Sequence, residues 1–75
     1  MDNNRERIRC VLRERRIELS LTQKEVAERA GIKLQQYQKF EGGERNVTTA
    51  SFDVVCRVIV ALELDISAFY LEHIK

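Results

Sequence analysis

The sequence predicts an all-α fold of five short helices packed around one core. The chain of 75 residues has no proline and only three glycines, which favours helices joined by short turns over a sheet with tight hairpins. Hydrophobic residues make up 44% and charged residues 33%, a composition typical of globular rather than disordered chains. Apolar residues also recur at spacings of three and four, the period of an amphipathic helix. At this length we expect one domain over residues 1–75.

The first helix is expected over residues 4–19, with Asp2 or Asn3 as its cap. Arg16 lies four residues after Leu12 and three before Leu19, so a charged side chain falls on the face that should be buried. The apolar stripe of this helix consists of Ile8, Val11, Leu12 and Leu19.

A capping box predicts the start of the second helix. Thr22 is followed three residues later by Glu25, so each side chain can bond the other residue's backbone amide. The helix is expected over residues 23–30, and Gly31 ends it because glycine tolerates a positive φ. Its inward-facing residues are Val26, Ala27 and Ala30.

The third helix is expected to follow at once, over residues 33–41. Tyr37 and Phe40 are its apolar anchors, and Gly42 and Gly43 close it.

Residues 44–49 are then expected to form a polar connection to a fourth helix over residues 50–62. Asp65 is the expected cap of a last helix over residues 66–74. The core stripe of the fourth helix would be Phe52, Val55, Cys56, Ile59 and Leu62, and the last helix would pack back through Ile66, Phe69 and Tyr70.

The charge distribution leaves two interpretations of the first helix open. The net charge is only +1, so the total charge does not identify a nucleic-acid-binding protein. A cluster of basic residues could bind phosphates, or it could be a solvated helix face balanced by Glu6, Glu14 and Glu18. The cluster consists of Arg5, Arg7, Arg9, Arg13, Arg15 and Arg16.

Other patterns argue against several classes of protein. No run approaches the ~18 apolar residues of a membrane span, and the first residues do not resemble a signal peptide, so we expect a cytoplasmic protein. Cys10 and Cys56 lack metal-site spacing and are expected to be buried apolar residues, and His73 is expected at the surface. With no catalytic set, metal cluster or phosphate-binding glycine loop, we expect no enzyme activity, no cofactor, no metal and no small-molecule ligand.

Residues 23–40 meet the demands of a helix-turn-helix. The two helices cross closely, so the crossing residue must be small, and Ala27 is small. The turn needs a glycine four residues later, which is Gly31. Apolar residues must then anchor the turn and the inner face of the second helix, as Ile32, Tyr37 and Phe40 can.

With these residues in place, the chain resembles the lambda repressor and Cro-like (XRE-like) helix-turn-helix family over nearly its whole length. The matching runs are LRERRIELSLTQ (12–23), EVAERAGI (25–32), FEGG (40–43) and the segment from 51 to 62. The resemblance implies a DNA-binding regulator that places the helix at residues 33–41 in the major groove of double-stranded DNA. It also implies a homodimer on a two-fold symmetric site.

The resemblance assigns roles to individual residues. Gln23 matches a glutamine that binds a phosphate and braces the recognition helix. Arg16 and Glu41 match a buried ion pair, which would explain the charged residue in the first helix. The remaining expected DNA-binding residues are Lys33, Leu34, Gln35, Gln36, Lys39, Arg45 and Asn46.

Some positions depart from the family pattern. Leu34 stands where a polar residue is common, so only contact with a thymine methyl remains there. Tyr37 replaces an aliphatic residue, and its hydroxyl needs a partner or water. The connection before Phe52 is about three residues longer than usual, which weakens the assignment of Arg45 and Asn46.

Two further hypotheses concern partners. The chain could instead be a protein-interaction module of the same fold, such as an antitoxin or an adaptor. If it is a dimer, the expected contact is the last helix and its junction with the fourth. The apolar residues assigned to that contact were Val54, Val58, Val60, Ala61 and Leu64, which could equally complete an intramolecular core.

Overall fold

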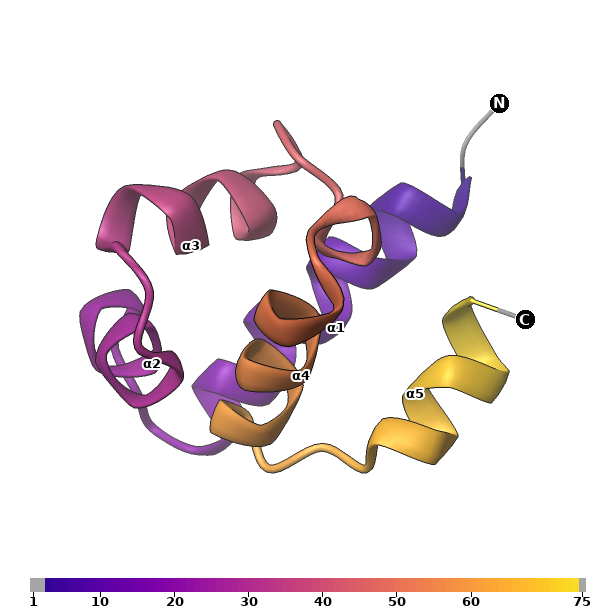
Figure 1. Cartoon of the computed structure of the whole chain (residues 1–75). Helices are drawn as coiled ribbons and strands as arrows, with labels where there is room; N and C mark the ends of the chain where they lie inside the picture. Colours follow the sequence, from indigo (N-terminus) through magenta and orange to yellow (C-terminus); the bar gives the residue numbers. More distant parts are fainter. Residues whose placement is uncertain (1–2, 75) are drawn as a thin grey trace.

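The computed structural model describes residues 3–74, and the regular structure in that range is entirely helical. The helices are α1 (Asn3–Glu18), α2 (Gln23–Ala30), α3 (Leu34–Gly42), the 3-10 turn η1 (Val47–Thr49), α4 (Phe52–Ala61) and α5 (Ile66–His73). Helices α2 and α3 lie at one end of the molecule and α5 at the other, with α1 and α4 between them (Figure 1). The predicted all-α fold is confirmed. The expected cap Asp2 lies outside the described residues.

The helix ends follow from local sequence. The predicted capping box is present: Glu25 N donates to Thr22 Oγ1 at 3.0 Å, and Thr22 N donates to Glu25 Oε1 at 2.9 Å. Asp65 caps α5, where its side chain accepts from Ala68 N at 2.9 Å. Gly31 ends α2 with a φ of 69°, a left-handed backbone conformation that favours glycine.

Two helix starts and one connection differ from the prediction. Lys33 is the N-cap of α3 rather than its first residue. Helix α4 begins at Phe52, two residues late, because Ser51 caps it. The expected polar connection contains η1, which Asn46 caps and in which Val47 is fully buried. A turn of three residues is too short to show a hydrophobic period in the sequence, so the burial of Val47 could not be predicted.

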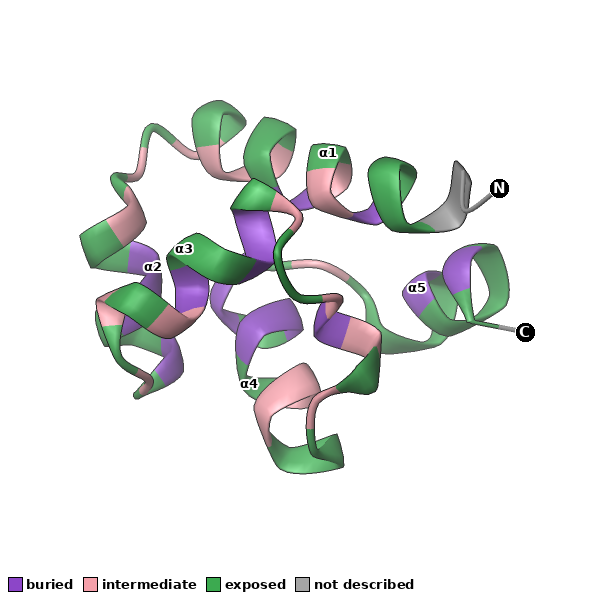
Figure 2. Cartoon of the chain, turned by 90° about the horizontal axis from the view of Figure 1, so that it is seen from above, coloured by how far each residue is buried: buried purple, intermediate pink, exposed green. Residues whose placement is uncertain are grey.

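The core lies where α1, α2, α3 and α4 meet, as the buried segments in Figure 2 show. Within the predicted stripe of α1, Val11 and Leu19 are only half-buried. The buried apolar residues are Ile8, Leu12, Val26, Ala27, Ala30, Tyr37, Phe40, Val47, Val58, Ile59, Ala61, Leu62 and Phe69.

The predicted buried face of α4 was partly wrong. Ile59 and Leu62 are buried as expected, but Phe52 is 82% exposed. Val58 and Ala61, which we had assigned to an intermolecular contact, fill the core instead. Because α4 packs along α2, its buried face turns toward that helix, and its first turn extends beyond the core.

The predictions for α5, for the two cysteines and for His73 were also partly wrong. Only Phe69 of the expected α5 anchors is buried, and Ile66 and Tyr70 are 43% and 50% exposed, because α5 packs against the molecule through one face only. Cys10 is exposed, whereas His73 is buried with its ring centroid 4.8 Å from that of Phe69. Cys56 is half-buried.

The contrast between two phenylalanines tests this packing. Phe40→Ala should lower the free energy of unfolding by about 3–5 kcal/mol, because it leaves a cavity in the core. Phe52→Ala should change it by no more than about 0.5 kcal/mol, because the side chain is already in solvent. Urea unfolding of dilute protein, followed by circular dichroism, measures both. Equal losses would show that Phe52 is covered within the chain.

Candidate nucleic-acid interface

Helices α2 and α3 form the predicted helix-turn-helix. Ala27 is 2% exposed, as the close crossing of the two helices requires. The turn is fixed by backbone bonds, with Gly31 N donating to Glu28 O at 3.2 Å and Ile32 N to Ala27 O at 3.0 Å. Tyr37 and Phe40 then bury the inner face of α3, so its opposite face is left outside.

The outer face of α3 is polar and accessible. Gln35, Gln38 and Lys39 are exposed, and Leu34 and Gln36 are half-buried. Helices α2, α4 and α5 and the turn η1 have side-chain N-caps, but Lys33, the N-cap of α3, makes no such hydrogen bond. The N-terminus of α3, which is the positive end of its helix dipole, is therefore not capped by a side-chain acceptor. The charged side chain of Lys33 lies beside it.

A buried ion pair joins α1 to the end of α3. Arg16 Nη2 lies 2.7 Å from Glu41 Oε1, and Arg16 Nε lies 2.9 Å from Oε2, a bidentate arrangement. The side chains are 16% and 4% exposed. Arg16 Nη1 also donates to Leu21 O at 2.9 Å, which ties the loop before α2 to the same pair.

Two more side chains surround this pair. Gln23 Nε2 donates to Glu41 Oε1 at 3.2 Å, and Gln38 Nε2 donates to Gln23 Oε1 at 3.3 Å. The anionic Glu41 fixes the orientation of the Gln23 amide, because only its nitrogen can face a carboxylate. The Tyr37 hydroxyl is buried beside the pair, and it makes no hydrogen bond of acceptable geometry with the described residues.

The ion pair governs the ionisation of its members. Burial raises the pKa of Glu41, but hydrogen bonds from Arg16 and Gln23, with the nearby Tyr37 hydroxyl, more than offset this and lower it below its usual value. Burial, reinforced by the adjacent carboxylate, raises the pKa of Tyr37 strongly. Glu41 is therefore charged and Tyr37 neutral near pH 7.

Much of the predicted arginine cluster has a structural role that the sequence did not reveal. Arg9 Nη1 donates to Glu41 O at 3.4 Å, at the end of α3, and Arg15 Nε donates to Leu62 O at 3.0 Å, at the end of α4. Arg57, outside the cluster, donates to the last carbonyl of α2 at 3.4 Å. Cations at these C-termini satisfy free carbonyls and offset the helix dipoles.

The loop after α3 carries Arg45 and Asn46, the last two predicted DNA-binding residues. Arg45 is exposed. Asn46 uses its carbonyl oxygen within the chain, accepting from Thr48 N at 3.0 Å and from Thr48 Oγ1 at 2.8 Å. Only the amide nitrogen of Asn46 is left for an external partner.

The family comparison agrees with this geometry. A helix-turn-helix family model matches residues 12–69. The chain belongs to the lambda repressor and XRE-like helix-turn-helix family. This is a family of DNA-binding proteins. The comparisons with curated proteins and with solved structures gave no match.

Residues 3–74 contain neither a candidate membrane span nor a candidate metal site. In this range no helix is both long and apolar enough to cross a membrane. The same residues contain no group of three or more histidine, cysteine, aspartate or glutamate side chains arranged to hold a metal ion.

Removing Arg16 tests the ion pair. Arg16→Ala should lower the free energy of unfolding by about 3–5 kcal/mol, because it leaves the Glu41 charge buried without its main partner. The exposed face of α3 keeps its side chains in this variant. A melting temperature equal to that of the parent would contradict the burial of this pair.

The pH dependence of stability is the control for that experiment. Folding lowers the pKa of Glu41 below its ordinary value of 4.5, so the ionised carboxylate stabilises the fold above that pH. This contribution should disappear as the pH falls below 4.5 and through the folded pKa. The double variant Arg16→Met, Glu41→Leu should lack that part of the acid sensitivity in parallel melts.

Proposed function

We propose that this chain is a sequence-specific transcriptional regulator that acts in the cytoplasm as a homodimer, with α3 in the major groove of DNA. The observation that carries the proposal is the outer face of α3. It is polar and accessible, and a buried ion pair holds the helix in a fixed orientation against α1. A rigid support of this kind suits side chains that must meet base edges.

Gln35 is the proposed base-recognising residue. It is exposed near the start of α3, and its amide can donate and accept at once, which matches the N6 and N7 edge of adenine. Lys39, one helical turn later on the exposed surface, suits a guanine or a phosphate. Leu34 would contact a thymine methyl, and Gln36 lies half-buried beside it.

Other residues are proposed to hold phosphates. Gln23 Nε2 gives one hydrogen to Glu41, so its second hydrogen is left for a phosphate oxygen. Lys33 stands at the start of α3, where the helix dipole adds to its own charge. Arg45, and the amide nitrogen of Asn46, would extend these contacts past the end of α3.

A second candidate is a protein-interaction module of the same fold, such as an antitoxin or an adaptor. The observation in its favour is the exposed apolar surface on α4 and α5, which includes Phe52 and Tyr70. The net charge of only +1 also gives little general attraction to DNA. The polar face of α3 has no evident purpose in this alternative.

Selection from a random pool of double-stranded DNA tests the proposal. We expect one enriched two-fold symmetric motif with half-sites about one helical turn apart. If Lys33, Lys39 and Arg45 of two copies neutralise six phosphates, affinity for that motif should fall ~10³-fold between 50 and 200 mM salt. No enrichment at low salt, or an affinity independent of salt, would favour the protein-interaction module.

Two glutamine variants separate base recognition from phosphate binding. Gln35→Ala should relax preference at one base pair per half-site, with a loss of about 1–3 kcal/mol on the best site only. Gln23→Ala should weaken all sequences nearly equally, because phosphates carry no sequence information. Binding to the selected site and to its single-base variants measures both effects. If Gln35→Ala weakens binding to every sequence equally, Gln35 does not recognise a base, and Lys39 becomes the next candidate for that role.

A further inference from the structure

Gln38 was not among the residues predicted to bind DNA, yet it lies within the outer face of α3. It is exposed, and it follows Leu34 by four residues and Gln35 by three, the spacings at which helical side chains are neighbours. On the surface of the helix it therefore lies between these two proposed DNA-facing residues. DNA that contacts both of them also meets Gln38.

A relay of hydrogen bonds connects Gln38 to the buried ion pair. Glu41 Oε1 accepts from Gln23 Nε2 at 3.2 Å, and Gln23 Oε1 accepts from Gln38 Nε2 at 3.3 Å. An amide can turn over and exchange its oxygen and nitrogen, but either exchange here would place two acceptors against each other. Glu41 thus fixes the amide of Gln23, and Gln23 fixes the amide of Gln38.

The relay determines which end of the Gln38 amide is presented to a partner. The nitrogen and its second hydrogen stay on the side of Gln23, so the oxygen, which can only accept, is the end turned away. Gln35 lies outside the relay, and its exposed amide can present either end. Two glutamines on the same helix face therefore differ in what they can recognise.

We propose that Gln38 is a specificity-determining residue that accepts a hydrogen bond from the exocyclic amino group of adenine or cytosine. The inference rests on the proposed function, because it requires α3 in the major groove. In that groove adenine and cytosine present an amino donor, whereas guanine and thymine present a carbonyl acceptor. A fixed oxygen therefore favours adenine or cytosine on the strand that it faces.

The fixed orientation is what makes the contact selective. A free glutamine meets an amino group with its oxygen and a carbonyl with its nitrogen, so it tolerates either kind of base edge. If Gln38 turned over to meet a carbonyl, its oxygen would face Gln23 Oε1, and the hydrogen bond between the two amides would be lost. The buried carboxylate of Glu41 thus influences base recognition through two amides.

Variants of Gln38 test the base preference. Beside the base pair of Gln35, the parent should prefer adenine or cytosine at one further pair per half-site, by a factor on the order of fivefold. Gln38→Ala should lose this preference and melt as the parent does, because the side chain is exposed. Gln38→Lys, whose ammonium can only donate, should shift it toward guanine or thymine. Binding to the selected site and to its single-base variants measures these changes and shows which amino base is preferred.

Gln23→Ala tests the relay itself. Beyond the nearly uniform loss expected from its phosphate contact, this variant should relax the preference at the Gln38 base pair and keep the preference at the Gln35 base pair. Nuclear magnetic resonance of the free protein gives a second measurement. The side-chain amide protons of Gln38 should exchange with water more slowly than those of Gln35, and this difference should disappear in Gln23→Ala.

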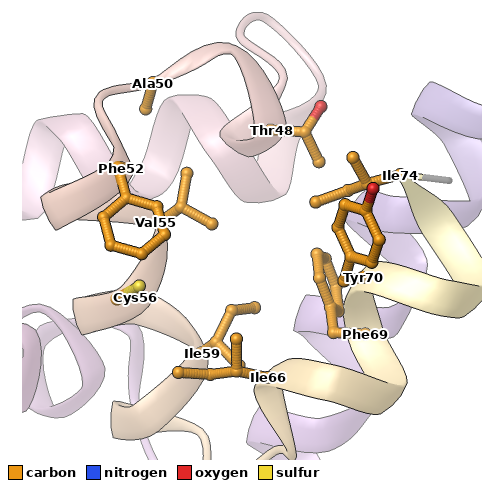
Figure 3. Close-up of a pocket in the computed structure, with 10 residues that line it drawn as sticks. All are labelled: Thr48, Ala50, Phe52, Val55, Cys56, Ile59, Ile66, Phe69, Tyr70 and Ile74. Atoms are coloured by element: carbon orange, nitrogen blue, oxygen red, sulfur yellow. The ribbon is translucent and has the colours of Figure 1, made fainter.

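Phe52→Ala is the control for changes far from α3. Phe52 is 82% exposed and lines an apolar groove of about 340 Å³ between α4 and α5, shown in Figure 3. None of the ten residues that line the groove carries a charge, and α5 lies at the opposite end of the molecule from α3 (Figure 1). This variant should leave every base preference unchanged, whatever its effect on overall affinity.

Three results would overturn the proposal. They are a Gln38→Ala variant that keeps every base preference of the parent, a parent that prefers guanine or thymine at the Gln38 base pair, and a Gln23→Ala variant that keeps the Gln38 preference. If the parent still selects a motif, these results refute the role of Gln38 and leave the proposed function standing. A parent that binds no DNA refutes both, even where the amide protons show the relay.

Discussion

The Arg16–Glu41 ion pair is the interaction on which the arrangement of α1, α2 and α3 depends. Two charges can be buried only if their hydrogen-bonding groups are satisfied, and this requirement brings together α1, the loop at Leu21, the first residue of α2 and the end of α3. The Gln23 amide is oriented by the same carboxylate. The direction in which α3 presents its outer face is therefore determined from inside the molecule.

Three further arginines join helices to one another in this chain with a small core. Arg9, Arg15 and Arg57 each reach the C-terminal carbonyls of another helix, where a guanidinium can bond free oxygens and offset the helix dipole. These contacts join helices that share limited apolar surface. They also place these three arginines at helix ends and not on the outer face of α3.

The sequence predicted the features that local chemistry determines. The capping box at Thr22, the glycine turn at Gly31 and the helical periods were enough for the fold, and the charged residue in the α1 stripe indicated a partner for Arg16. Features that depend on how helices pack were not accessible. Periodicity places Phe52 and Val58 on neighbouring faces of α4, but only the position of α2 decides which is buried. The arginine contacts to carbonyls have no sequence pattern, because any helix end can accept them.

The uncovered surface of α5 follows from the small size of the chain. A chain of this size buries a smaller fraction of its surface than a larger domain does, and here the shortfall appears at one end, where Phe69 is covered and Tyr70 is not. A partner that covered this end and bound only the folded chain would stabilise the fold by mass action. The apolar surface left out of the core at α5 is therefore the place where binding of a partner and folding would reinforce one another.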